Sequence, residues 1–204
     1  MSTKEMILEA ARQLFNEYRS TNVSTKVIAA EMGISPGNLY YHFRNKEEII
    51  RCIYDQLSAA MDTLFWDSEA RQSEAGIVQF YKDFGKLQKH YRFFYLELSV
   101  LVCNDPILLE TYRQRSDRVM RQFNNVFLYW VSTGIMKKFK SDAEREMLVL
   151  NVWTLGQLWL THADILDANI PPEVIQKGIL RLHALLRPYF TAKTNKKMER
   201  LLQG

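Results

Sequence analysis

The stretch from residue 24 to residue 48 constrains the fold of this chain most strongly. Its pattern predicts two short helices joined by a tight turn and followed directly by a third helix. Gly33 lies where the chain must reverse after an apolar-periodic segment, and glycine takes the left-handed backbone of a helix exit without steric cost. Ser35 can cap the next helix, and Pro36 at its first position lacks an N–H that would have no partner there. The stretch therefore predicts a helix-turn-helix, whose second helix can enter the major groove of DNA.

The second helix of this unit is predicted to have an inward and an outward face. Leu39 and Phe43 stand four residues apart on one face, so we expect them to pack inward. The groups left on other faces are short or planar, and such groups can reach base edges or phosphate oxygens: Gly37, Asn38, Tyr41 and His42. The alternative is that the aromatic side chains of residues 40–42 complete a small helical core.

A longer helix is predicted to begin directly after this unit. Asn45 and Glu48 stand three residues apart before an apolar-periodic run, which is a capping-box pattern. Lys46 lies in the first turn, where helix polarity disfavours a cation, and a nearby anion such as a phosphate would explain its place. Ser24 and Thr25 open the first short helix and could offer hydroxyl groups to the DNA backbone. A single lysine of this kind can equally be a solvated charge.

Further matches lie in the opening helix, at Ile7-Leu8, Ala10-Ala11 and Leu14-Phe15. With these residues in fixed spacing, the segment from residue 5 to about residue 50 resembles the DNA-binding domain of the TetR family of transcriptional regulators. The resemblance implies backbone or base contacts with DNA from Ser24, Thr25, Lys26, Pro36, Gly37, Asn38, Tyr40, Tyr41, His42 and Lys46. The chain departs from the family at Arg19 and Ser20, where members usually have glycine and then an aromatic residue. The path of the loop from residue 18 to 23 is therefore left open.

The rest of the chain is predicted to be helical. It has no alternating run of Val, Ile and Thr of the strand type, and Pro and Gly are scarce between residues 67 and 170. After the long helix that runs from residue 45 towards residue 66, helices are expected over about 74–90, 92–103, 106–136, 142–167 and 172–190. We expect an all-α protein with an N-terminal helix-turn-helix DNA-binding domain, residues 1–48, and a helical ligand-binding and dimerisation domain, residues 49–204.

The last two predicted helices carry apolar side chains on more than one face, so each needs packing partners on two sides. One side can be the core of the domain, and the other can be the same helices of a second subunit in a four-helix interface. The TetR resemblance implies the same arrangement. The alternative is a helix buried centrally in a monomer. The interface is predicted at Leu155, Trp159, Ile175, Ile179, Leu182 and Leu186.

Aromatic residues concentrate in the middle of the chain, with polar groups among them that could orient a ligand. The family resemblance implies an effector pocket in this region, for a small and largely apolar molecule. The predicted lining residues are Phe94, Glu97, Phe123, Phe127, Trp130, Asn151, Thr154, Gln157 and His162. A series of arginines between residues 113 and 121 could attract an anionic effector or could form a solvated helix face.

The charge of the chain is a weak guide to its partner. The formal net charge is +4, yet the first 50 residues hold as many acidic as basic side chains. DNA binding by this segment would therefore rest on a few placed contacts used in two copies and not on a broad basic field. The basic segment 193–204 is expected to be a frayed, solvated terminus.

Several protein classes lack the sequence features that they require. No segment approaches the ~20 apolar residues of a membrane-spanning helix, and the first residues do not form a signal peptide, so we expect a cytoplasmic protein. Cys52 and Cys103 lack CxxC spacing and indicate reduced thiols. His162, Asp164 and Asp167 share a helix face poorly as metal ligands, so neither a metal nor another cofactor is expected.

Three classes of function remain to be compared. We expect a homodimeric DNA-binding regulator that binds a palindromic operator and responds to an effector, with repression as the favoured mode. The alternative is a DNA-binding protein of the same scaffold controlled by a protein partner. An all-helical enzyme is not expected, because the sequence has no HExxH, P-loop or GxSxG motif and no CxxC pair.

Overall fold

The computed structural model describes residues 2–66, 73–166 and 172–203, apart from the side chains of residues 65, 66, 166, 172–175 and 203. Over these residues the chain forms α-helices, short 3-10 helices and no β-strand, which confirms the expected all-α class. The elements are, in order, α1 (Thr3–Tyr18), η1 (Ser20–Asn22), α2 (Thr25–Glu31), α3 (Pro36–His42), α4 (Lys46–Trp66), α5 (Glu74–His90), α6 (Arg92–Asn104), α7 (Pro106–Ser132), α8 (Asp142–Leu166), α9 (Pro172–Leu186), η3 (Arg187–Tyr189) and α10 (Ala192–Gln203).

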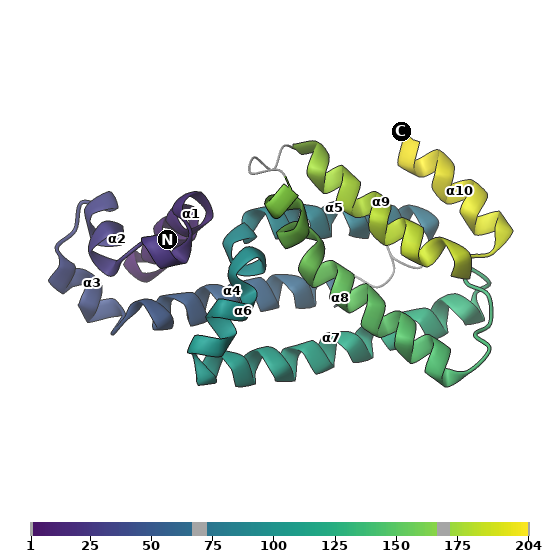
Figure 1. Cartoon of the computed structure of the whole chain (residues 1–204), viewed down its shortest axis with the longest axis horizontal. Coiled ribbons are helices and arrows are strands. Elements are labelled where there is room, and N and C mark those ends of the chain that lie inside the picture. Colours follow the sequence, from purple (N-terminus) through teal and green to yellow (C-terminus); the bar gives the residue numbers. More distant parts are fainter. Residues whose placement is uncertain (1, 67–72, 167–171, 204) are drawn as a thin grey trace.

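Helices α1, α2 and α3 form a small head at one end of the molecule, and α5 to α10 form a larger helical body (Figure 1). Helix α4 leads from the head into the body as one continuous helix. The expected domain boundary at residue 48 therefore falls in the first turn of α4. Helix α10 lies at the end of the molecule opposite the head (Figure 1).

The head is built from the local signals in its sequence. At the start of α1, the Glu5 N–H donates to Ser2 Oγ (3.2 Å) and the Ser2 N–H donates to the Glu5 carboxylate (2.7 Å), which completes a capping box. Between α2 and α3, Gly33 takes a φ of +65°, in the left-handed region that favours glycine. Leu39 and Phe43 are fully buried, as predicted.

One hydrophobic core continues from the head into the body. Phe15 of α1 packs on Phe93 of α6, with ring centroids 5.2 Å apart, and α4, α7 and α8 contribute to the same cluster. A second cluster, which includes Tyr81, Phe127 and Phe190, fills the part of the body formed by α5, α7, α8, α9 and α10. The shared core means that the head is packed against the body and is not held by a linker alone.

Polar contacts fix the head against the body. The Arg12 guanidinium and the Asn16 amide both donate to the carbonyl oxygen of His90, at 2.7 and 2.8 Å. The Asn16 side-chain oxygen also accepts from the Phe93 N–H (2.9 Å). Each of these bonds joins α1 to the junction of α5 and α6, where backbone groups at helix ends need partners. The orientation of α1 relative to this junction is therefore specified.

The loop whose path the sequence left open makes two more such contacts. Arg19 has a positive φ of 71°, and its side chain forms an ion pair with Asp164 of α8. The next residue, Ser20, donates its N–H to the buried carboxylate of Glu97 on α6 (2.8 Å). The departure from the family pattern at Arg19 and Ser20 thus lies at the contact between head and body.

Two predicted helix boundaries were wrong. The helix expected over 106–136 ends at Ser132, because Gly134 turns the chain with a φ of +76° and Met136 then pairs with Phe190 in an isolated bridge. The helix expected over 172–190 ends at Leu186.

The prediction of a frayed C-terminal segment was also wrong, because α10 packs on the body. Met198 of α10 is fully buried, and Lys197 forms an ion pair with Glu74 of α5 (2.7 Å). This ion pair lowers the pKa of the Glu74 carboxyl group. The basic residues of this segment lie on a helix whose apolar face completes the second core cluster.

None of the helices in the described ranges is both long and apolar enough to cross a lipid bilayer.

Candidate functional site

The outward face of α3 forms a compact exposed surface. Tyr41 is 86% exposed and Tyr40 is 49% exposed, and Pro36, Gly37 and Asn38 are exposed beside them. His42 is half-buried, and its ring contacts the Tyr41 ring edge-on at 5.2 Å. The alternative that residues 40–42 complete a small core was therefore wrong for the two tyrosines. A helix with exposed planar and amide side chains has groups that can hydrogen-bond to base edges and to phosphate oxygens.

The start of α2 lies beside this surface. The Ser24 hydroxyl caps α2 by accepting from the Val27 N–H (3.4 Å), and Lys26 is exposed next to it. The Thr25 hydroxyl is half-buried and lies 3.1 Å from the Tyr40 hydroxyl, so it joins α2 to α3. This contact holds the Tyr40 ring in place at the edge of the exposed surface.

Gly37 has a particular place on α3. Its φ is not positive, so its backbone does not require glycine. A Cβ built at this position would meet only the Ser35 hydroxyl, at 3.8 Å, so the packing of the chain does not require glycine either. The remaining physical use of a bare backbone here is the close approach of a partner outside the chain.

Lys46 is engaged within the protein. Its ammonium group donates to the carbonyl oxygen of Ser20 at 2.6 Å, and the side chain is half-buried. This bond explains the position of a lysine in the first turn of α4 without an external anion. The predicted Asn45–Glu48 cap is present in modified form, because the Glu48 N–H donates to Asn45 while the Glu48 carboxylate accepts from the Arg44 N–H.

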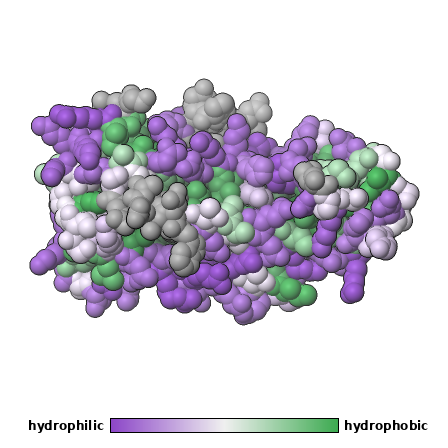
Figure 2. Space-filling view, turned by 180° about the vertical axis from the view of Figure 1, so that it is seen from behind, coloured by the Kyte–Doolittle hydropathy of each residue, from purple (hydrophilic) through white to green (hydrophobic). Residues whose placement is uncertain are grey.

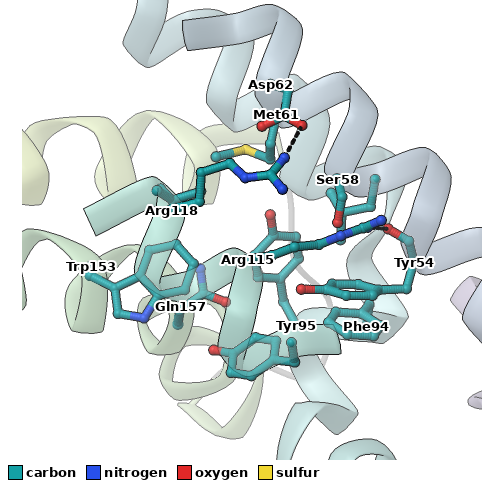
Figure 3. A pocket seen from close by; sticks show the side chains of 13 residues that line it. Tyr54, Ser58, Met61, Asp62, Phe94, Tyr95, Arg115, Arg118, Trp153 and Gln157 are labelled. Atoms are coloured by element: carbon teal, nitrogen blue, oxygen red, sulfur yellow. Dashed lines mark hydrogen bonds and ion pairs between the residues drawn. The ribbon is translucent and has the colours of Figure 1, made fainter. Parts of the chain in front are cut away.

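A pocket lies in the body where α4, α6, α7 and α8 meet (Figure 3). Its cavity measures about 40 Å³, which is room for a few water molecules. Its walls are largely aromatic. The ring of Tyr54 on α4 stacks on Phe94 of α6 with the ring centroids 4.7 Å apart, and the ring centroids of Tyr112 on α7 and Trp153 on α8 are 6.4 Å apart. Burial raises the pKa of Tyr54 to about 12 and also raises the pKa of Tyr112, so both phenols stay neutral at physiological pH.

Only two of the predicted ligand-binding residues, Phe94 and Gln157, line this pocket. The others do not line it, for three physical reasons. Glu97 is buried under the head and bonded to Ser20. Three residues lie in the second core cluster, namely Phe123, Phe127 and Trp130. Three residues are exposed on the outer face of α8, namely Asn151, Thr154 and His162.

Sequence reasoning missed Tyr54 and Trp153 as lining residues. It considered Arg115 and Arg118 only within a series of arginines that could attract an anionic effector or form a solvated helix face, and both line this pocket. Arg115 donates to the carbonyl oxygen of Tyr54 (3.3 Å) and pairs with Asp55 (3.0 Å). The three-residue spacing of the arginines placed them on one helix face, but no sequence signal showed that this face of α7 meets α4.

The predicted dimer-interface residues pack within the chain itself. Trp159, Ile179, Leu182 and Leu186 are buried, and Leu155 is half-buried against both core clusters. The side chain of Ile175 lies outside the described residues. Gly178 shows how close this packing is, because a Cβ there would lie 2.6 Å from the Trp159 ring.

Other apolar residues of α8 and α9 are exposed. They stand three, eight and seven residues apart along α8, with one more on α9: Met147 (57%), Leu150 (48%), Leu158 (52%), Ile165 (77%) and Leu180 (45%). Figure 2 shows the molecule from behind the view of Figure 1, and there hydrophilic residues predominate, with hydrophobic residues in small separate groups. The exposed side of α8 therefore carries apolar side chains interrupted by the polar residues Asn151, Thr154 and His162; these apolar residues are called the apolar stripe below.

Among the described residues, no group of three or more His, Cys, Asp and Glu side chains is arranged to hold a metal ion. Asp167, one of the three residues considered from the sequence, lies outside them. Cys52 and Cys103 are free thiols, and burial raises the pKa of Cys52.

Two family models match the chain. The model described as bacterial regulatory proteins of the tetR family matches residues 7–53. The model described as bacterial transcriptional repressor matches residues 56–198, which is more than half of the chain. Among curated proteins, the regulator UidR of Escherichia coli (strain K12) is 45% identical over 51 residues, which cover 25% of this chain and 26% of UidR. That match spans about a quarter of the length of either protein.

Solved structures extend the similarity over the whole fold. A TetR-family transcriptional regulator from Marinobacter aquaeolei VT8 has a TM-score of 0.88 and 31% identity, covering 100% of this chain and 98% of that one. The SmeT–triclosan complex has a TM-score of 0.64 at 16% identity, covering 95% and 94%. A regulator from Saccharomonospora viridis in complex with choline has a TM-score of 0.68 at 18% identity, covering 90% and 95%. The last two show a shared fold.

Proposed function

Because the chain belongs to the TetR family of transcriptional regulators, we propose that it is a homodimeric DNA-binding regulator that binds a palindromic operator. Repression is the favoured mode, and the pocket between α4, α6, α7 and α8 binds a small-molecule effector. Such a protein works on chromosomal DNA, so we expect it in the cytoplasm. It has no enzymatic role in this proposal.

The observation that carries the DNA-binding proposal is the exposed face of α3. Gly37, Asn38 and Tyr41 lie together on it, and neither the backbone nor the packing of the chain accounts for glycine at position 37. Asn can bond adenine bidentately, and a tyrosine hydroxyl can donate to a phosphate oxygen. We assign DNA contacts to these residues and to Ser24, Lys26, Pro36 and Tyr40, with Thr25 and His42 supporting them. Lys46 is not assigned a DNA contact, because its ammonium group is bonded to the Ser20 carbonyl within the protein.

The apolar stripe on α8 supports the homodimer. We assign the interface to Met147, Leu150, Leu158 and Ile165 of α8 with Leu180 of α9, in place of the buried residues predicted from the sequence. An isologous interface of these two helices with their copies would cover the stripe. Two heads held in this way would read two half-sites on one face of the duplex, about 34–36 Å apart or a multiple of that distance.

The pocket touches the helix that carries the head. Tyr54 and Asp62 belong to α4, which begins at Lys46, four residues after the end of α3. A ligand that moves α4 relative to α7 would change the separation of the two heads. If the ligand binds one of these two positions of α4 more tightly than the other, it shifts the protein towards that position and so changes the affinity for the operator. The triclosan and choline complexes of the structural neighbours support a small molecule as the effector.

Control by a protein partner is the second candidate. The observation that favours it is the cavity volume of about 40 Å³, well below the ~300–1,000 Å³ of a pocket for a drug-sized ligand. A small effector must therefore open the pocket on binding. Mass spectrometry of small molecules that copurify with the protein discriminates between the two candidates.

Selection of bound genomic DNA fragments, followed by gel-shift titration of the selected operator, tests the proposal. Gly37→Ala and Tyr41→Ala should each weaken operator binding at least about tenfold while leaving the unfolding midpoint and the oligomeric state unchanged. Tyr18→Ala is the matched control, because Tyr18 is 52% exposed on α1 and lies outside the proposed surface. Equal losses of operator affinity in Tyr18→Ala and Tyr41→Ala would contradict the assignment of α3 as the reading helix.

A further inference from the structure

The walls of the effector pocket are flat and aromatic. Tyr54 and Phe94 stack nearly parallel, with 15° between their ring planes. The ring centroid of Tyr112 on α7 lies 6.1 Å from that of Tyr54. Trp153 extends this group of rings onto α8. Aromatic walls of this kind favour a ligand with a planar ring system, which stacks on them or meets them edge-on.

The charged groups of the lining are two arginines and one aspartate: Arg115, Arg118 and Asp62. Each arginine pairs with a carboxylate of α4, Arg115 with Asp55 and Arg118 with Asp62, and a guanidinium that leaves its partner matches the two oxygens of a ligand carboxylate. Figure 3 shows Arg118 reaching from α7 to Asp62 on α4.

Two neutral polar side chains that line the same cavity make no hydrogen bond within the part of the protein that the structure describes. Tyr95 is 3% exposed and Gln157 is 8% exposed, and both line the cavity. Within residues 2–66, 73–166 and 172–203, neither side chain has a hydrogen-bond partner. Burial raises the pKa of Tyr95, so its phenol keeps its proton and remains a donor. A ligand in the cavity that accepts hydrogen bonds would give both side chains a partner.

The two arginines differ in how firmly they are held. Arg115 is 28% exposed, contacts Asp55 and the Tyr54 carbonyl, and lies over the Tyr54 ring at 5.2 Å. Arg118 is 58% exposed, and its single contact with Asp62 is 3.5 Å long. An exposed and long ion pair contributes little to stability, so it is readily exchanged for a better one. Arg118 is therefore the cation that is available to a ligand.

From these observations we propose that the effector is a planar aromatic anion, such as an aromatic carboxylate, bound by Arg118 in place of Asp62. Its rings meet the edge of Tyr54, whose two faces are covered by Phe94 and Arg115, and lie against Trp153. Tyr95 and Gln157 provide hydrogen bonds. Binding breaks the contact between α7 and α4 at Asp62, which loosens α4 on the side of the body. This inference rests on the proposed function, in which the body of the protein binds a small molecule.

Calorimetric titration of the full-length protein with 2-naphthoate and with 2-naphthamide tests the inference. The two probes have the same rings and nearly the same shape, and only the first carries a negative charge. We expect 2-naphthoate to bind at least about tenfold more tightly than 2-naphthamide. Arg118→Gln should weaken 2-naphthoate binding at least about tenfold and leave 2-naphthamide binding unchanged. Asp62→Asn, which removes the competing carboxylate, should tighten 2-naphthoate binding several-fold.

Arg121→Gln is the matched control, because it removes the same charge from an exposed position of α7 that does not line this pocket. The inference is overturned if neither probe binds, if both bind equally well, or if Arg118→Gln has no larger effect than Arg121→Gln. Operator binding is measured separately by gel shift. Failure of the anion preference with intact operator binding refutes this inference alone, whereas a wild-type protein that selects no DNA refutes the proposed function.

Discussion

Arg19 provides a direct test of the contact between head and body. Its φ of 71° and ψ of 146° lie close to a region of backbone conformation that is populated almost only by glycine. The N–H of Arg19 still donates to the Phe15 carbonyl (3.0 Å), and its side chain pairs with Asp164. The residue therefore combines a strained backbone with an ion pair across the two parts of the molecule. Replacing it with alanine or with glycine separates these two contributions.

The expected magnitudes follow from this geometry. The side chains of Arg19 and Asp164 are 32% and 18% exposed, so their ion pair contributes about 0–1 kcal/mol after screening by solvent. Both substitutions remove the pair, but only Arg19→Gly removes the backbone strain, which is about 1–3 kcal/mol. Glycine also costs about 0.4–1 kcal/mol of stability through the entropy of the unfolded chain. We expect Arg19→Gly to be about 1–2 kcal/mol more stable than Arg19→Ala.

Urea unfolding at a fixed protein concentration measures the difference, since the stability of an oligomer depends on that concentration. Asp164→Asn is the control, because it removes the ion pair and keeps Arg19 and its backbone. It should match Arg19→Ala to within a few tenths of a kcal/mol. An Arg19→Gly protein that is no more stable than Arg19→Ala would refute the reasoning that this backbone is strained.

Three further predictions concern the body of the protein. Leu158→Glu should give monomers with weakened operator binding in sedimentation and gel-shift experiments, whereas Leu128→Glu, at a similarly exposed leucine of α7, should leave the assembly intact. Gly178→Ala should lower the free energy of unfolding by about 1–3 kcal/mol in urea because its Cβ would overlap the Trp159 ring, and Gly156→Ala, whose Cβ would meet Phe84 at an ordinary 3.5 Å, should not. Burial, with a smaller contribution from Arg187, lowers the pKa of His183 below the ordinary 6.5. The free energy of unfolding is therefore at its full value above pH 6.5 and falls as the pH drops below 6.5, because the unfolded chain then binds a proton at this residue more readily than the folded chain does. His183→Phe should reduce the difference in urea midpoint between pH 7.5 and pH 5.5.

Much of the head could be predicted because its signals are local. Gly33 at the helix exit, the Ser35 cap and the four-residue spacing of Leu39 and Phe43 each act within one or two turns of the chain. The exposure of Tyr41 followed from the same spacing, since the buried pair fixes which face of α3 points inward. Lys46 shows the limit of this reasoning, because its partner Ser20 lies 26 residues away in a loop that the sequence pattern did not describe.

The pocket and the contact surface of α8 could not be predicted in the same way. Helix α8 is apolar on nearly all sides, so periodicity does not distinguish its buried face from its exposed face. The interface was accordingly predicted at Trp159, which is buried, and not at its neighbour Leu158, which is 52% exposed. Thr154 and Gln157 were both assigned to the pocket, and only Gln157 reaches it.

The sequence alone determined the all-α class, the helix-turn-helix and the face of α3 that is exposed, because caps, a glycine exit and apolar spacing are interactions between residues close along the chain. Only the tertiary structure decided which side of α8 packs inward and which aromatic rings and arginines share a pocket. The helices in question are joined by contacts between residues dozens of positions apart, such as Arg118 with Asp62 and Arg19 with Asp164. Their pairing depends on how whole helices pack, and no local pattern records it.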